Sequence, residues 1–208
     1  MSMTENTLIK PTGANTADNI DTREKLNIIL FSAGKLVSLL GTYIYSFAIS
    51  LYILKVTGSG TSFAWSIFVG TLPRIIFSPI AGSLADRVDR KKMIVGLDFL
   101  SGIVVLALWA LSMLFGLKLM FIYTATAILS IISCFFNTCF QAAMPKLVTE
   151  KNLVKINSYN RAIDSGSSII APALGGVVFG VISIKLFLLI NGISFILSRI
   201  DWLTPLPV

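Results

Sequence analysis

Four ionisable side chains interrupt stretches of this sequence that are otherwise apolar. These residues are Lys35, Arg74, Asp98 and Asp164. A charged side chain at the centre of a lipid bilayer costs at least about 2.5 kcal/mol, so it is expected to face a bundle interior, a water-filled cavity or an opposite charge. Two cations and two carboxylates in one bundle could bind a substrate, carry a proton or neutralise one another. The sequence therefore indicates a polar site inside an apolar protein.

In a functional interpretation, these charges belong to a transport path. Lys35 and Arg74 would line the path of a substrate, and Asp164 would carry a coupling proton. Asn137 and Gln141 are spaced i,i+4, so on a helix they share one face and could join this path. We favour this interpretation for Lys35 and Arg74, because deep charges are expensive and usually functional. For Asp164, both interpretations remain open.

In a structural interpretation, the same charges only neutralise one another. Asp98 and Asp164 would pair with nearby arginines, with Asp98 and Arg161 in one charge network, while Lys35 would extend to the membrane surface. We favour this interpretation for Asp98, because it lies near a basic turn.

That turn carries a dense set of charges between two apolar stretches. Its sequence is Gly82-Ser-Leu-Ala-Asp86-Arg87-Val-Asp89-Arg90-Lys91-Lys92. The glycine permits close helix packing, and the basic side chains favour the cytoplasmic face and anionic lipid. The alternative is an ordinary basic loop that includes an incidental acid.

The elements that must position these residues are six apolar stretches. They span 27–54, 62–84, 93–115, 119–143, 157–182 and 184–200. The first five reach the roughly 20 residues that a helix needs to cross the hydrocarbon of a bilayer, while the sixth is marginal. Only helices satisfy their own backbone hydrogen bonds in lipid. We therefore predict an all-α membrane protein, a bundle of six transmembrane helices.

Composition agrees with a lipid environment. The 208 residues are 55% hydrophobic and only 13% charged, whereas a soluble domain carries roughly 25% charged residues. We predict a polar cytoplasmic N-terminal tail over 1–26, the bundle over 27–200, and a short polar tail over 201–208 that we interpret as the result of truncation.

The positions of the basic residues predict an orientation. With the amino terminus inside, twelve of the 17 lysines and arginines fall on the cytoplasmic side and three on the opposite side. By the positive-inside rule, both termini are cytoplasmic. The same distribution accounts for the net charge of +7 without a nucleic-acid partner.

The sequence offers no residues for catalysis or metal binding. It contains no histidine, so a Ser/His/Asp or Cys/His set is excluded, and it has no phosphate-binding loop for ATP. We interpret Cys134 and Cys139 as small core residues. We expect neither an enzyme nor a cofactor nor a metal site, and any proton relay must use carboxylates.

The charged turn resembles the signature loop of the major facilitator superfamily, Gly-x-x-x-Asp-Arg-x-Gly-Arg-Arg/Lys. It also follows the second helix, as in that family, although Asp89 stands where glycine is commonest. The resemblance implies that Gly82, Asp86, Arg87, Arg90 and Lys91 form a conformational latch. That latch would hold the cytoplasmic side closed in the outward-facing state.

The fifth stretch resembles a pattern of exporters in this superfamily, Gly-x-x-x-Gly-Pro-x-x-Gly-Gly. This chain has Ser167, Ala171, Pro172, Gly175 and Gly176 at the corresponding positions. Small residues on one face let helices approach closely, and a proline bends a helix, so the resemblance implies a gating helix. Ordinary packing between membrane helices is the alternative.

The flanking sequences Phe135-Phe136-Asn137 and Gln141-Ala-Ala-Met-Pro145 look like the macrolide and siderophore exporter branch, which consists of drug:proton antiporters. This resemblance implies one half of a 12-helix fold, built from two inverted three-helix repeats. It implies secondary active, proton-coupled efflux of small amphipathic molecules or drugs across the cell membrane, and hence multidrug resistance. A C-terminal six-helix half is the expected partner, and it is absent here. The alternative is a non-transporting six-helix scaffold or regulatory subunit.

Overall fold

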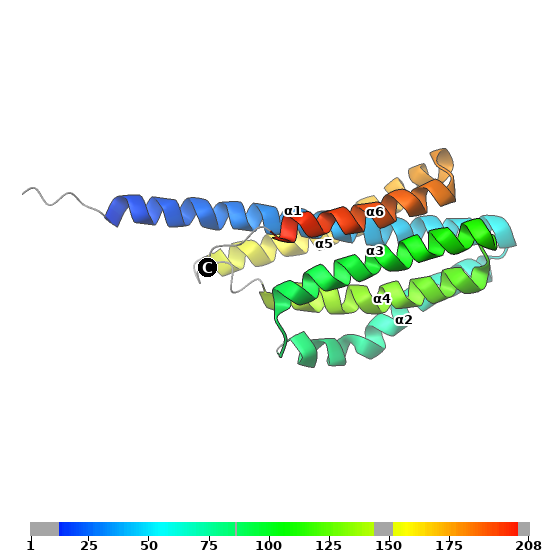
Figure 1. Ribbon diagram of the computed structural model, residues 1–208, viewed down its shortest axis with the longest axis horizontal. Coiled ribbons are helices and arrows are strands. Elements are labelled where there is room, and N and C mark those ends of the chain that lie inside the picture. Colours follow the sequence, from blue (N-terminus) through cyan, green and yellow to red (C-terminus); the bar gives the residue numbers. More distant parts are fainter. Residues whose placement is uncertain (1–12, 86, 144–151, 204–208) are drawn as a thin grey trace, which may run out of the picture.

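The computed structural model describes residues 13–85, 87–143 and 152–203, and these residues form six α-helices without a strand (Figure 1). The helices are α1 (Gly13–Thr57), α2 (Gly60–Ala85), α3 (Arg90–Leu114), α4 (Leu119–Ala143), α5 (Leu153–Val181) and α6 (Ile184–Leu203). The prediction of an all-α six-helix bundle is therefore confirmed.

Five helices contain segments that are long and apolar enough to cross a membrane. These segments are Ser32–Thr57, Gly60–Ala85, Arg90–Leu114, Leu119–Ala143 and Leu153–Val181. The helix α6 offers the shorter apolar segment Ile184–Leu197, in agreement with the marginal sixth stretch of the sequence.

Several helix ends lie outside the predicted limits. The helix α1 begins at Gly13 and not near residue 27, and α6 continues to Leu203. The predicted limits marked where the apolar pattern starts and stops. A helix, however, ends where its backbone hydrogen bonds end, and polar residues such as Glu, Lys and Arg continue a helix readily.

The helices pack in pairs that repeat within the bundle. The most extensive contacts join α1 to α5, α2 to α4 and α3 to α6, and further contacts join α3 to α4 and α1 to α6. These five contacts show a symmetry between the two halves of the bundle. If α1 is exchanged with α4, α2 with α5 and α3 with α6, the same set of contacting pairs is obtained. The contact between α1 and α2 is the exception. This arrangement is the one that two inverted three-helix repeats require.

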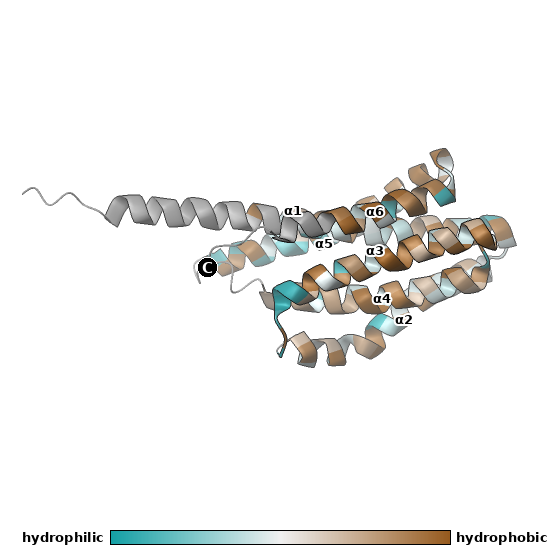
Figure 2. Ribbon diagram, in the orientation of Figure 1, coloured by the Kyte–Doolittle hydropathy of each residue, from teal (hydrophilic) through white to brown (hydrophobic). Residues whose placement is uncertain are grey.

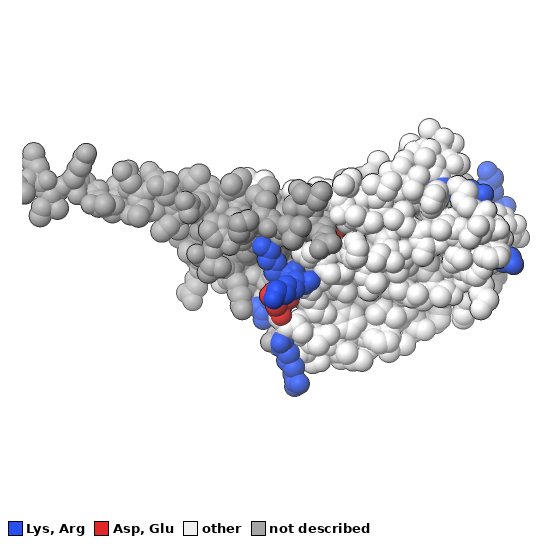
Figure 3. All heavy atoms as spheres, viewed as in Figure 1, with Lys and Arg blue, Asp and Glu red and all other residues white. Residues whose placement is uncertain are grey.

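Charge is concentrated at the two ends of the bundle. On the face shown in Figure 3, the Lys and Arg atoms gather at opposite ends, and the middle is uncharged. Figure 2 shows mainly apolar residues along the helices between these ends. The start of α1, the end of α6 and the turn between α2 and α3 lie at the same end (Figure 1), as six crossings require.

Two buried clusters form the core. The larger cluster joins α1, α3, α4 and α6 and includes Tyr45, Ile49, Ile53, Val105, Leu108, Ile122, Leu129, Leu188 and Phe195. The smaller cluster lies near the α2–α3 turn and contains Ala85, Ile94, Phe136, Cys139, Phe140 and Ile156. Both Cys134 and Cys139 are free and buried, which confirms that they are core residues.

Two glycines allow α3 and α6 to approach each other closely. A Cβ atom at Gly102 would lie 2.7 Å from the Ile196 side chain and 3.1 Å from the Gly192 carbonyl oxygen. A Cβ atom at Gly192 would lie 2.7 Å from the Leu106 side chain. This contact, the Gly102–Gly192 seam, depends on the absence of side chains, as is common between membrane helices.

We expect Gly102→Ala to lower the melting temperature of the full-length protein in detergent. The added methyl group overpacks the seam, at a cost of about 1–3 kcal/mol, which outweighs the gain in helix propensity of about 1 kcal/mol. The control is Gly96→Ala on the same helix, where nothing lies within 4 Å of the new Cβ atom. Equal melting temperatures for the two variants would show that the seam tolerates a side chain.

Candidate functional site

A buried ion pair joins α1 to α5. The Nζ atom of Lys35 lies 2.5 Å from Oδ1 of Asp164, and it also donates a hydrogen bond to Oδ1 of Asn160. The same Nζ atom lies 5.1 Å from the centre of the Phe140 ring on α4. The predicted pairing between intramembrane charges is therefore present, and its members are Lys35 and Asp164.

The two members of this pair differ in exposure. The Lys35 side chain is 0% exposed, whereas the Asp164 side chain is 36% exposed. The interpretation in which Lys35 extends to the membrane surface is wrong, because its amino group is fully occupied inside the bundle. The expectation that Asp164 pairs with an arginine is also wrong, because its partner is Lys35 on α1.

Asn160 belongs to this site, although sequence reasoning missed it. It lies one helical turn before Asp164 and is 7% exposed. The spacing i,i+4 places both side chains on one face of α5. A polar residue one turn from an intramembrane carboxylate was the signal that could have identified it.

Arg74 lies on α2 and faces α4. Its Nη2 atom donates a hydrogen bond to Oγ of Ser133 over 3.2 Å. Two further side chains of α4 bind the backbone of α2 nearby: Ser130 Oγ donates to the Gly70 carbonyl over 2.5 Å, and Cys134 Sγ donates to the Arg74 carbonyl over 3.5 Å. The predicted cation of the path is therefore held between two helices.

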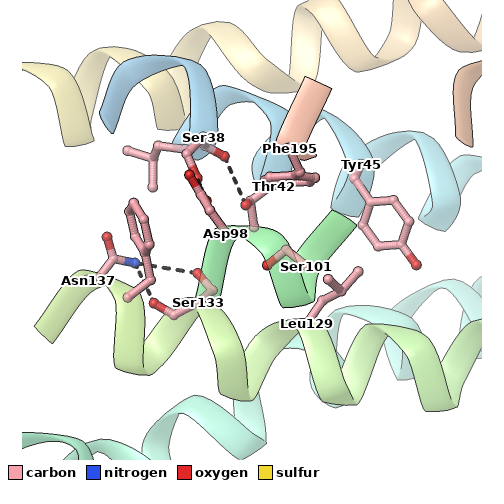
Figure 4. A pocket seen from close by; sticks show the side chains of 11 residues that line it. Ser38, Thr42, Tyr45, Asp98, Ser101, Leu129, Ser133, Asn137 and Phe195 are labelled. Atoms are coloured by element: carbon pink, nitrogen blue, oxygen red, sulfur yellow. Dashed lines mark hydrogen bonds between the residues drawn. The ribbon is translucent and has the colours of Figure 1, made fainter. Parts of the chain in front are cut away.

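Asp98 lies in the interior, in a small polar cavity between α1, α3 and α4 (Figure 4). It is 1% exposed and accepts a hydrogen bond from Ser38 Oγ over 2.7 Å. The cavity has a volume of about 10 Å³, close to that of one water molecule. Arg161 is exposed on α5, so its network with Asp98 remains a prediction.

Of the two amides predicted on α4, the structure places one beside this cavity. The Nδ2 atom of Asn137 donates to the Ser133 carbonyl over 3.0 Å, and Ser133 lines the same cavity (Figure 4). Gln141 is exposed near the end of α4. Asn137 therefore joins the polar interior and Gln141 does not.

The turn between α2 and α3 is described except for Asp86, which lies outside the described residues. The Nε atom of Arg90 donates to the Ala85 carbonyl over 3.2 Å, so this side chain binds the last residue of α2. Arg87 is exposed and Lys91 is half-buried. Nothing lies within 4 Å of a Cβ atom built on Gly82. The expectation of close packing at Gly82 is therefore wrong for the part of the chain that is described.

Asp89 departs from the family pattern for a physical reason that sequence reasoning missed. Its Oδ1 atom accepts hydrogen bonds from the backbone N–H groups of Lys91 and Lys92, over 3.1 Å and 3.3 Å. Asp89 is thus the N-cap of α3. Aspartate is among the preferred residues at that position, which is the signal that could have been read.

The small residues of α5 form a packing face against α1. Ser167, Ala171 and Gly175 are buried, and a Cβ atom at Gly175 would lie 3.1 Å from the Phe47 ring and 3.3 Å from the Ile44 carbonyl oxygen. Gly176 has no neighbour within 4 Å of its Cβ position. The close approach of helices therefore uses every fourth residue, beginning at Ser167.

Pro172 lies inside α5, directly after Ala171 of this packing face. A proline at this point removes one backbone hydrogen bond of the helix. The close packing and the proline thus meet in the middle of α5, and the role of this region in gating remains a prediction.

Comparison with known proteins identifies the family. The family model of the Major Facilitator Superfamily matches residues 31–207. The chain belongs to the major facilitator superfamily. No solved structure shows a significant match.

Several members of the superfamily with assigned names are similar to this chain. Macrolide efflux protein A from Streptococcus pyogenes is 29% identical over 85% of this chain, which covers 44% of that protein. The multidrug efflux pump Tap from Mycolicibacterium fortuitum is 27% identical over 75% of this chain and 39% of the pump. The putative bacilysin exporter BacE from Bacillus subtilis is 31% identical over 64% of this chain and 32% of the exporter. The chain thus spans less than half the length of these relatives.

We expect Asp164→Asn to destabilise the protein more than Lys35→Met does. The first change leaves a fully buried ammonium group without its counter-charge, at a cost of about 3–5 kcal/mol. The second change leaves a carboxylate that is partly exposed, so its cost is smaller. The melting temperatures of the full-length variants in detergent give the order.

The double variant Lys35→Met with Asp164→Asn provides the matched comparison, because it removes both charges and leaves none unpaired. We expect it to be more stable than Asp164→Asn alone, with a coupling energy above about 0.5 kcal/mol. Additive effects of the two single changes would contradict a direct interaction.

Proposed function

We propose that this chain forms the amino-terminal half of a proton-coupled exporter of small amphipathic molecules, including drugs. It supplies one wall of the transport path, and a second six-helix half supplies the other. The superfamily consists of membrane transporters, and the relatives named as efflux pumps and exporters support the direction of transport. The chain lies in the cell membrane with both termini in the cytoplasm, because the basic turn between α2 and α3 favours that face.

The observation that carries the proposal is the unequal burial of the Lys35–Asp164 pair. The ammonium group lies fully inside the bundle, while the carboxylate is partly exposed. A proton from outside the bundle therefore has easier access to Asp164 than to Lys35. Protonation of Asp164 removes the counter-charge of a buried cation, which is costly. Proton binding therefore weakens the contact between α1 and α5 and changes how these two helices pack.

The remaining predicted residues have roles in the same cycle. Alternating access is rocking of one half against the other around the central path. The turn of Gly82, Asp86, Arg87, Arg90 and Lys91 is the latch that closes the cytoplasmic side. The face of α5 that contains Ser167, Ala171 and Gly175, with Pro172 beside it, is the contact that adjusts as α1 moves.

We expect Asp164→Asn to abolish efflux driven by a pH gradient while it preserves substrate exchange. An asparagine cannot take up a coupling proton, but exchange of labelled for unlabelled substrate requires only the movement of the loaded carrier. The measurement uses membrane vesicles that contain the full-length protein, with and without an imposed pH gradient. The control is Lys155→Gln, an exposed residue on the same helix, which should retain both activities. If Asp164→Asn still responds fully to the gradient, another group carries the proton.

We expect Asp86→Asn to abolish efflux of a fluorescent drug from cells that produce the full-length protein. Loss of the carboxylate removes the acid of the latch, so the turn can no longer form the charged contacts that closure requires. The control is Lys92→Gln, which changes an exposed residue of the same turn and should leave efflux close to that of the unaltered protein. Unchanged efflux by Asp86→Asn would contradict the latch. Stable expression without efflux, even of the unaltered protein, would favour the non-transporting scaffold.

A further inference from the structure

A second, larger cavity lies between α1, α2 and α4, next to Arg74. Its volume is about 130 Å³, enough for a small functional group and too small for a whole drug molecule. Its lining contains Arg74 and the hydroxyl-bearing residues Thr42, Tyr43, Tyr45, Ser46, Thr71, Thr126 and Ser130. The cavity therefore offers a cation surrounded by hydroxyl groups.

Arg74 has a donor that no described residue accepts. Its Nη2 atom binds Ser133, but its Nε atom is buried and has no hydrogen-bond partner among the residues that the structure describes. Buried donors without a partner are rare, and each one calls for an explanation such as a bound group. Guanidinium groups present several N–H donors in a fixed fork that fits a carboxylate. A ligand oxygen in the cavity would satisfy this donor.

The charge balance of the cavity is positive. Arg74 is the one charged residue in its lining, and no carboxylate of the described residues lines it. Asp164 pairs with Lys35. Asp98 lines the small cavity, which adjoins this one and shares Thr42, Tyr45 and Leu129 with it, and it accepts a hydrogen bond from Ser38 there. An anionic group is therefore attracted to this wall and a cationic group is repelled.

We propose that this cavity binds the carboxylate of an amphipathic substrate, which Arg74 recognises through its guanidinium group. The proposal rests on the proposed export function and assigns its substrate class. Among the hydroxyl groups of the lining, Thr42, Thr71 and Ser130 already donate to backbone carbonyl oxygens. The further hydrogen bonds to the carboxylate oxygens therefore come from Tyr43 and Ser46. Beside them, Ile67 and Leu129 contact the apolar part of the molecule. The exporter thus selects amphipathic acids over amphipathic amines.

Three probes with one apolar body test this selectivity. They are pyrenebutanoate, pyrenebutylamine and the neutral pyrenebutanol. Binding to the purified full-length protein is measured as saturable energy transfer from tryptophan to pyrene. We expect the unaltered protein to bind the carboxylate at least about tenfold more tightly than the amine, as a charge-assisted hydrogen bond implies.

Substitutions of Arg74 locate the origin of this preference. In Arg74→Gln the ratio of the two dissociation constants should fall to within about twofold of one, and in Arg74→Lys an intermediate preference should remain, since charge is kept and the fork is lost. The control Lys155→Gln, which changes an exposed residue outside the cavity, should keep the full preference. Binding of pyrenebutanol reports whether each variant is folded, and the ratio in the unaltered protein decides the question even if Arg74→Gln does not fold.

Two results would overturn the anion site. One is equal or tighter binding of the amine by the unaltered protein, and the other is a preference that persists in folded Arg74→Gln. Efflux of the same probes from cells separates this inference from the proposed function. Efflux of the amine alone would leave export standing and remove the anion site. Selective binding of the carboxylate without efflux of any probe would leave the anion site standing and contradict export.

Discussion

The bilayer provides no water to the interior of this bundle, and that constraint governs where every polar group lies. Hydroxyl side chains such as Thr42, Ser50 and Thr57 donate to carbonyl oxygens one turn earlier in their own helix. Lys35 can remain buried only because Asp164 and Asn160 from α5 meet it. In the described part of the chain, very few buried side-chain atoms lack a partner, and one of them is Arg74 Nε, beside a polar cavity. The exception therefore falls where a ligand has room.

The pairing of helices decides which side chains can form a path. The helix α1 packs against α5, and α2 packs against α4, so charges that are far apart along the chain meet across two helix pairs. The first pair holds the neutralised charges Lys35 and Asp164, and the second holds Arg74. The third pair, α3 and α6, contributes the close seam at Gly102 and Gly192. A proton and a substrate would thus act on separate helix pairs that share contacts through α1 and α4.

Hydropathy was sufficient to predict the fold, because lipid imposes one rule on every segment that crosses it. The family followed from the spacing of charges in one turn. The partner of each charge did not follow, since Lys35 and Asp164 lie 129 residues apart and only the packing of α1 on α5 brings them together. The capping role of Asp89 could be predicted from the sequence, because aspartate is a preferred N-cap residue, although Asp89 departs from the signature of the family. Gly82 is predicted to permit close packing, yet no described residue lies near its Cβ position, because a glycine in a motif does not reveal which surface approaches it.

The Gly102–Gly192 seam has a consequence for the order of assembly during synthesis. It joins α3 to α6, the last helix of the bundle. The two glycines can pack together only after both helices have entered the membrane. The helix α3 therefore enters the membrane before its close partner has left the ribosome. During that interval, its small-residue face must contact lipid or the insertion machinery. Completion of the bundle is thus coupled to the emergence of α6, and a ribosome that pauses before α6 would leave the other helices without their final contact.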